Sequence, residues 1–144
     1  MLGTVAAHGW RCVAAYVPLR TEPGSPELLE GLVSSGVEVL VPITLADRDL
    51  DWAPWRNGGP GPALGTSAVA RAQAVLVPAF AVGHDGMRLG RGGGSYDRAL
   101  SRCAPTAVTA ALLFDGEREA EVPAHSWDRP VHAVITPAGW TQLR

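Results

Sequence analysis

Two short apolar runs with a helical pattern between them place the strongest limit on the fold of this chain. The first run, RCVAAYV at residues 11–17, stops at Pro18, which suits a buried strand that ends where the backbone donor is lost. A helix is predicted from Pro26, Gly36 is placed to end it, and the run VEVLVPI at 37–43 predicts a second strand. Strand, helix and strand within about 30 residues form a βαβ unit, so the two strands are expected to lie parallel.

The remaining sequence continues this alternation of strands and helices. Further strands are predicted where β-branched and apolar residues cluster, at 74–80, 106–114 and 131–136. A short helix is predicted over 63–72 and another from about Ser95 to Cys103, whereas 47–62 reads as an irregular connection rich in Asp, Gly, Pro and Trp. The pattern predicts a three-layer α/β fold with a mostly parallel sheet flanked by helices.

Length and composition limit the function classes. With 144 residues the chain is expected to form a single domain over 1–144. The formal net charge of −2 and the scattered basic residues, all twelve of them Arg, argue against a nucleic-acid or anionic-membrane surface. Cys12 and Cys103 are interpreted as reduced core thiols because they lack metal-site spacing. No apolar run approaches the roughly 20 residues of a membrane span, so a cytoplasmic location is expected.

A glycine-rich stretch with two arginines, RLGRGGGSYD at 88–97, is the candidate for chemistry. Glycines let the backbone approach a ligand and turn successive N–H groups toward phosphate oxygens, and the following helix adds its N-terminal partial charge. Arg88 and Arg91 can each grip phosphate with a guanidinium fork. The stretch is neither a Walker loop nor a complete GxGxxG motif. A flexible surface loop is the alternative, but the two arginines favour an anion or polyphosphate site.

Four blocks of sequence carry a resemblance to a known family. The longest is LVPAFAVGHDGMRLGRGGGSYDRAL at 76–100, and weaker blocks follow the same order at 14–23 (AAYVPLRTEP), 37–43 (VEVLVPI) and 122–136 (VPAHSWDRPVHAVIT). Together they resemble the 5-formyltetrahydrofolate cyclo-ligase (5,10-methenyltetrahydrofolate synthetase) family. The resemblance implies a Rossmann-like sheet with sugar-phosphate isomerase/CoA-transferase-like topology. It also implies ATP-dependent closure of 5-formyltetrahydrofolate to 5,10-methenyltetrahydrofolate, with release of ADP and phosphate.

The resemblance also implies roles for individual residues. Val17 and Glu22 would contact the folate, Asp97 and Asp128 would hold Mg²⁺, and Arg91 would act in catalysis. The positions implied to bind ATP are Arg88, Leu89, Gly90, Arg91, Gly92, Gly93, Gly94, Ser95 and Tyr96. Those from Arg91 to Ser95 would also face the folate substrate. From the residues alone, Asp97 could equally be an ordinary acidic residue in the first turn of a helix.

The implied partners are small molecules, the folate substrate and ATP with Mg²⁺, for a monomer or weak homodimer. The sequence departs from the family pattern in four places. It starts almost at the first strand, where the family has a basic helical segment, and the connection between Trp55 and Ala63 is shortened and lacks the family's Glu-Pro turn. Ser95 replaces an aromatic residue, and Gly83 replaces an aspartate. Two alternatives stay open: a degenerate member that binds nucleotide or folate as a regulatory module, and a different phosphate-handling enzyme, such as a sugar-phosphate isomerase-like protein.

Overall fold

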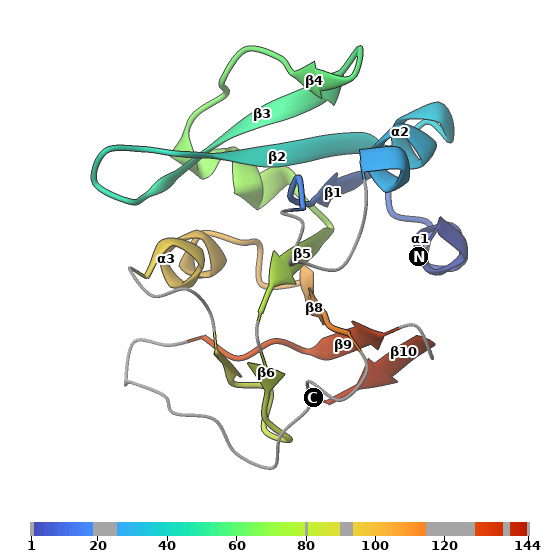
Figure 1. The fold of residues 1–144 in the computed structure, drawn as a ribbon, viewed down its shortest axis with the longest axis vertical. Coiled ribbons are helices and arrows are strands. Elements are labelled where there is room, and N and C mark those ends of the chain that lie inside the picture. The colour runs from blue at the N-terminus through green and yellow to red at the C-terminus, as the bar shows by residue number, and fades with distance from the viewer. Residues whose placement is uncertain are drawn as a thin grey trace.

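A mixed eight-stranded sheet organises the chain in the computed structural model (Figure 1). The structure describes residues 2–18, 26–79, 81–89, 94–114, 129–136 and 139–143. The strands of the main sheet, in spatial order, are β10 (Gly139–Gln142), β9 (Ala133–Thr136), β8 (Val108–Leu112), β5 (Ala74–Pro78), β1 (Cys12–Ala14), β2 (Glu38–Thr44), β3 (Leu50–Arg56) and β4 (Gly59–Pro60). A separate two-stranded hairpin joins β6 (Ala81–Val82) to β7 (Arg88–Leu89).

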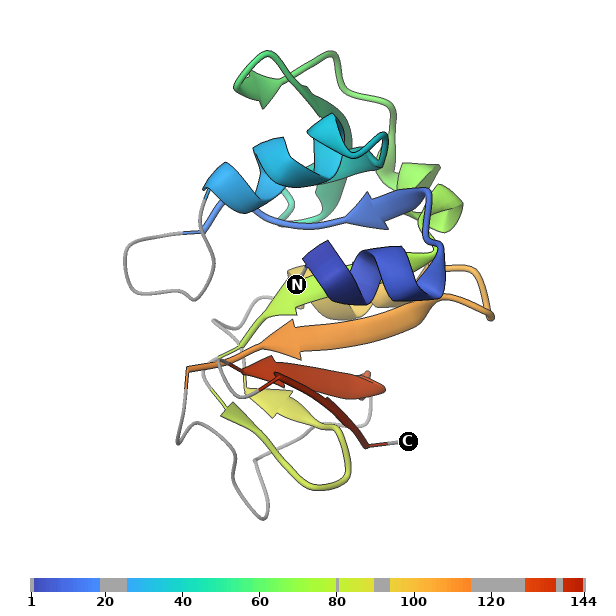
Figure 2. The same ribbon diagram turned by 90° about the vertical axis from the view of Figure 1, so that its right-hand side faces the viewer.

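The centre of the sheet is parallel and its margins are antiparallel. β1 pairs in parallel with β2 and β5, and the parallel pairing continues from β5 through β8 to β9. β3, β4 and β10 are added antiparallel. The parallel strands therefore end at one common edge of the sheet, which Figure 2 shows as arrowheads pointing the same way. The expected parallel βαβ unit is confirmed for β1, α2 (Pro26–Ser34) and β2.

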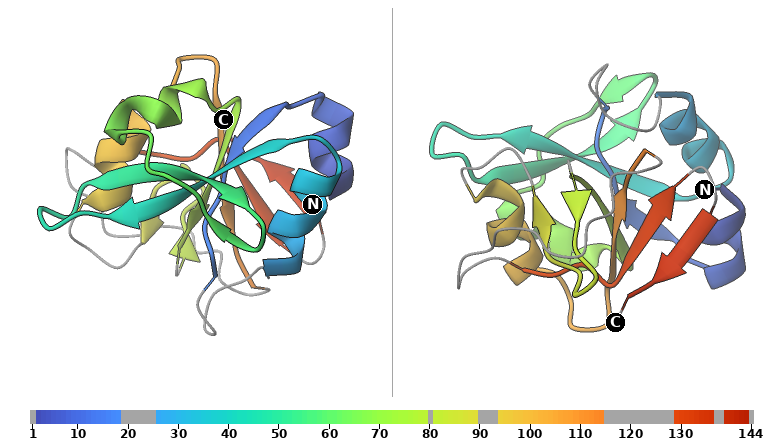
Figure 3. Two further views of the ribbon diagram at one scale, coloured as in Figure 1. Left: turned by 90° about the horizontal axis from the view of Figure 1, so that it is seen from above. Right: turned by 60° about the horizontal axis from the view of Figure 1, so that its bottom comes forward.

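Helices cover both faces of the sheet, which makes the three layers that the sequence predicts (Figure 3). Because side chains alternate along a strand, Val13 packs in one buried cluster and Ala14 in the other. The first cluster lies beneath α1 (Leu2–His8) and α2, which contribute Val5, Leu29 and Leu32. The second lies beneath η1, a 3-10 helix over Thr66–Arg71, and α3 (Ser95–Ser101).

Several predicted boundaries agree with the structure and others do not. α2 begins at Pro26, and Gly36 beyond its end has φ of 86°, a left-handed conformation that glycine adopts readily. The irregular connection predicted over 47–62 is wrong, because β3 and β4 form there. Two elements were not predicted: α1, which precedes β1, and β10, which pairs with β9. Pro54 of β3 lies next to the two-residue outer strand β4, where few ladder hydrogen bonds are needed.

The structure also bears on the two cysteines and on the expectation that no segment spans a membrane. Cys12 and Cys103 are free, as predicted, and burial raises the pKa of each thiol to about 11, so both stay protonated near neutral pH. They are unsuited to act as nucleophiles. Within the part of the chain that the structure describes, no helix is long and apolar enough to span a membrane.

Candidate functional site

The carboxyl edge of the parallel strands has a topological switch between β1 and β5. The chain leaves β1 toward β2 on one side, and leaves β5 toward β8 on the other. In open α/β sheets, ligands bind outside the carboxyl ends of the strands at such a point. Val17 lies just beyond the end of β1 and is 44% exposed, which is unusual for a large apolar side chain in this structure. A surface available to an apolar ligand group therefore stands beside the switch.

A small cluster of polar and aromatic side chains forms where the hairpin β6–β7 meets α3. Arg88 comes from β7, while Tyr96 and Asp97 come from the first turn of α3. The Arg88 guanidinium carbon lies 5.4 Å from the centre of the Tyr96 ring, within the range of a cation–π contact. Arg88 Nη2 lies 3.7 Å from Asp97 Oδ1, and the side chains are only 8% and 15% exposed. The structure thus brings together three residues that the sequence assigned to ligand binding.

A fourth residue joins this cluster from the segment that leads into β9. The backbone N–H of Arg129 donates to Asp97 Oδ1 at 3.0 Å. Two residues later, the Val131 N–H donates to the carbonyl oxygen of Gly86 at 2.8 Å, so this segment is tied to the β6–β7 turn as well. Arg129 was not among the predicted site residues. Its position next to Asp128 in the sequence was the one available signal, since Asp128 was implied to be a metal ligand.

The predicted site residues divide into described and undescribed positions. Glu22, Asp128 and the loop centre, including Arg91, lie outside the described residues, as do Gly90, Gly92 and Gly93. The backbone of Leu89 pairs with Ala81 in the small hairpin. The Ser95 hydroxyl donates to the carbonyl oxygen of Arg48 at 2.5 Å, so it serves a contact within the fold.

The aromatic side chains also fall into two groups. Tyr16, Trp52 and Trp55 are buried in the core clusters. Tyr96 is partly exposed and carries Arg88 over its ring. Of these rings, only that of Tyr96 belongs to the cluster described above.

The fit of a divalent cation can be tested on Asp97. Within the described ranges, no group of three or more His, Cys, Asp or Glu side chains is arranged to hold a metal ion. Magnesium, however, is commonly held by one or two carboxylates together with phosphate oxygens and water. Asp97 is a partly exposed carboxylate next to the glycine-rich loop, so it fits a site of that kind.

Gly94 links the loop to α3 in a left-handed conformation, with φ of 70° and ψ of 14°. A Cβ built on Gly94 would meet no described atom within 4 Å outside its chain neighbours, so backbone strain is the main penalty of a substitution. We expect Gly94→Ala to lower the free energy of unfolding by about 1–2 kcal/mol. Urea denaturation would measure this change.

Gly3→Ala is the matched control, because Gly3 lies inside α1 with open space around it and without a positive φ. There the same substitution should raise stability by about 0.5–1 kcal/mol, since alanine favours a helix. Equal effects of the two substitutions would contradict the strain assigned to Gly94.

An ion pair anchors the other end of α3. Arg102 donates to both carboxylate oxygens of Asp49 at 2.6 Å, and the Leu50 N–H donates to Asp49 Oδ1 at 2.8 Å. The hydrogen bonds from Arg102 hold the pKa of the Asp49 carboxyl below its usual range. Asp49 is therefore ionised in the fold at pH values where an unfolded chain would begin to protonate it.

This lowered pKa predicts a dependence of stability on pH. A carboxyl whose pKa is lower in the folded state stabilises the fold above its unfolded pKa, and this stabilisation is lost as pH falls below about 4. We expect the free energy of unfolding of the parental chain to drop more between pH 5 and pH 3 than that of Asp49→Asn. Urea titrations at several pH values would test this. The same drop in both proteins would contradict it.

The chain is similar to known proteins over most of its length. Residues 4–137 match the model of the 5-formyltetrahydrofolate cyclo-ligase family. A 5-formyltetrahydrofolate cyclo-ligase of Mycolicibacterium smegmatis is 38% identical, in an alignment covering 92% of this chain and 80% of the relative. The enzyme of the same name from Escherichia coli K12 is 32% identical over 71 residues, which is 49% of this chain and 39% of that protein.

Two solved structures share the fold. The 5,10-methenyltetrahydrofolate synthetase of Mycoplasma pneumoniae superposes with a TM-score of 0.75 at 18% identity, covering 93% of this chain and 80% of that one. The 5,10-methenyltetrahydrofolate synthetase of Aquifex aeolicus gives a TM-score of 0.76 at 20% identity, covering 99% and 79%. At these identities the likeness establishes the α/β architecture alone.

Proposed function

Because the chain belongs to the 5-formyltetrahydrofolate cyclo-ligase family, we propose that it closes 5-formyltetrahydrofolate to 5,10-methenyltetrahydrofolate at the expense of ATP. The match over residues 4–137 is the observation that carries this proposal. The similarity to the mycobacterial cyclo-ligase extends over most of both chains and supports it. No observation favours the alternative of a module that only binds nucleotide or folate.

The proposed reaction has two steps. The formyl oxygen attacks the terminal phosphorus of ATP, the bond to ADP breaks, and the formyl group becomes a phosphorylated imidate. N10 of the folate then attacks the activated carbon and loses its proton, and the carbon–oxygen bond breaks to release inorganic phosphate. Such phosphoryl transfer depends on holding the groups in line and on neutralising charge, both of which guanidinium groups and backbone N–H groups can supply.

The ATP phosphates are proposed to lie against the glycine-rich loop and the Arg88 cluster. Arg88 is a largely buried cation beside Asp97, and its guanidinium has a planar fork of donors that matches phosphate oxygens. Arg91 and the glycines from Gly90 to Gly93 are proposed ligands on the resemblance of their sequence.

Mg²⁺ is proposed to be held by Asp97 and Asp128 together with phosphate oxygens. When bound, it would neutralise charge on the transferred phosphoryl group. The Asp97 carboxylate already accepts from the Arg129 N–H, which helps to fix its orientation. Orienting contacts of this kind keep a ligating oxygen in place before the ion arrives.

The folate is proposed to bind beside β1. Val17 offers an exposed apolar surface at the switch between β1 and β5, and Glu22 is proposed to accept hydrogen bonds from the pterin. The two substrates would then meet at the carboxyl edge of the sheet.

Absorbance of the methenyl product provides a direct test. Purified protein is incubated with 5-formyltetrahydrofolate, Mg²⁺ and ATP, and the reaction is repeated without ATP and without Mg²⁺. Product should form only in the complete mixture, with one ADP released for each folate closed. Folate or ATP binding by calorimetry without any product would instead identify a binding module and overturn the proposed activity.

A further inference from the structure

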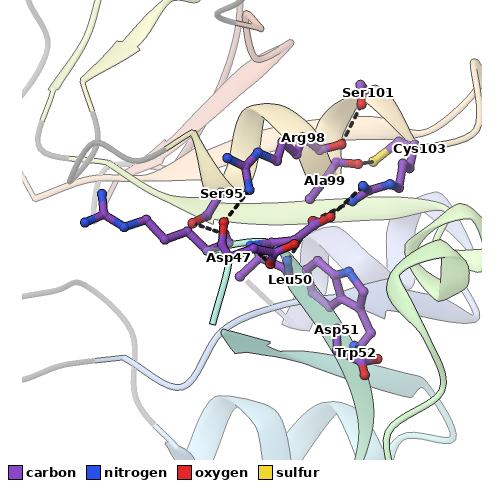
Figure 4. A network of polar contacts seen from close by, with 12 residues as sticks. Asp47, Leu50, Asp51, Trp52, Ser95, Arg98, Ala99, Ser101 and Cys103 are labelled. Atoms are coloured by element: carbon purple, nitrogen blue, oxygen red, sulfur yellow. Dashed lines mark hydrogen bonds and ion pairs between the residues drawn. The ribbon is translucent and has the colours of Figure 1, made fainter. Parts of the chain in front are cut away.

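The turn between β2 and β3 meets α3 through three consecutive residues. The Arg48 carbonyl oxygen accepts from Ser95 at 2.5 Å, and the Asp47 carbonyl oxygen accepts from Arg98 Nη1 at 2.7 Å. Asp49 completes the set with its two hydrogen bonds from Arg102. Figure 4 shows Ser95 and Arg98 on the side of α3 that faces Asp47.

The three contacting residues, two in α3 and the third its C-cap Arg102, form one stripe along the helix. Their positions, 95, 98 and 102, follow the spacing i, i+3 and i+7, which places them on a single face. Between the first and last lie about 10 Å of helix, at about 1.5 Å of rise per residue. Contacts at both ends fix the direction of the helix axis as well as its location.

Apolar packing holds α3 through few side chains. Ala99 is buried, and Tyr96 and Leu100 are partly buried against the second core cluster. A helix of seven residues also has little stability of its own. The polar contacts to the turn therefore add a directional restraint that this small apolar face lacks.

The turn itself is well braced. The Leu45 N–H donates to the Asp49 carbonyl oxygen at 2.8 Å, and the Asp49 N–H donates to Asp47 Oδ1 at 3.0 Å. Arg48 adopts a left-handed conformation with φ of 68°, which turns its carbonyl toward Ser95. Because these contacts hold the turn in place, the turn can itself fix the position of α3.

We propose that Asp49 and Arg102 are positioning residues for the reaction, because they hold α3 so that Tyr96 and Asp97 meet Arg88 at the ATP site. Neither residue is required to touch a substrate. This inference rests on the proposed function, because the Arg88 cluster is taken as part of the ATP site. The positioning of α3 by the turn, which is the structural half of the inference, can be measured without any substrate.

Asp49→Asn and Arg102→Met each break the ion pair and are the main test variants. We expect ATP to bind about fivefold or more weakly in both, measured by calorimetry with Mg²⁺ present, since small misplacements of binding groups carry large penalties. Arg102→Lys keeps the positive charge but lacks the guanidinium fork, so its ATP affinity should lie between those of the parental chain and Arg102→Met. Exchanging the partners in Asp49→Arg/Arg102→Asp should restore part of the affinity.

Glu38→Gln is the matched control. Glu38 pairs with Arg71 at the amino-terminal end of β2, and the two side chains are more exposed than Asp49 and Arg102. Its loss should leave ATP affinity unchanged. A decrease in affinity equal to that of Asp49→Asn would overturn the inference, because any broken ion pair would then have the same effect.

Amide hydrogen exchange separates this inference from the proposed function. In Asp49→Asn, the Arg98 and Ala99 amides of α3 should exchange about tenfold faster, whereas the Leu76 amide of β5 should be unchanged. Unchanged exchange in α3, or equal acceleration in β5, would overturn the control of α3 by the turn. A parental chain that neither binds ATP nor makes product would overturn the proposed function, and the exchange result would still decide the structural half.

Discussion

Arg88→Met is expected to weaken ATP binding by about 1.5–3 kcal/mol, the value of a hydrogen bond to a charged group. This corresponds to roughly 10- to 150-fold in Kd. The Arg88 side chain is 8% exposed and lies over Tyr96, so its guanidinium is already oriented before a ligand arrives. A preorganised, poorly solvated cation contributes more to anion binding than a mobile one on the surface. Calorimetric titration of ATP into both proteins measures the change.

Methionine keeps the unbranched stem that packs against the ring while removing the charge. Arg56→Met is the matched control, because Arg56 is exposed at the end of β3 and far along the chain from the loop. It should bind ATP as the parental chain does. A Kd of Arg88→Met within twofold of the parental value would remove Arg88 from the site.

The elements that the sequence predicts correctly are those whose local signals and packing agree. α2 begins at Pro26 and turns at Gly36, and its leucines face the core, so propensity and burial favour the same boundaries. β3 was missed because Pro54 and Asp51 within the segment are poor strand formers. Its formation depends on pairing with β2 and on the full burial of Trp52, neither of which is visible locally.

α1 and β10 illustrate the same dependence on tertiary structure. α1 contains Gly3, Thr4 and Val5, which have modest helix propensity, but Val5 is buried against the core cluster under α2. β10 pairs with β9 over only four residues. Packing against an existing element stabilises both, so a local pattern was insufficient to find them.

For the candidate site too, the sequence indicated some of the residues but not the contacts between them. The residue types of the loop and its resemblance to a family indicated Arg88, Tyr96 and Asp97 as neighbours of a phosphate. Their mutual contacts, and the role of Arg129, arise from the meeting of β7, α3 and the segment before β9. The contact between the turn at 47–49 and α3 joins residues about 50 positions apart, as for Asp49 and Arg102, and no local pattern predicts it.

Asp97→Asn is expected to lower kcat by at least about 10²-fold, or about 2.7 kcal/mol of transition-state stabilisation. Asparagine retains an oxygen that can accept from the Arg129 N–H, so the local contact at 3.0 Å can persist. The substitution removes the negative charge, which is what attracts a hard divalent cation. The Mg²⁺ concentration for half-maximal rate should rise in parallel.

Asp85→Asn is the control for this charge. Asp85 is an exposed aspartate in the β6–β7 turn whose Oδ1 accepts from the Met87 N–H, a contact that asparagine can also make. It should leave both kcat and the Mg²⁺ dependence unchanged. If Asp97→Asn instead binds ATP more weakly but needs no more Mg²⁺, the carboxylate serves to orient Arg88, because a metal ligand must alter the response to the metal.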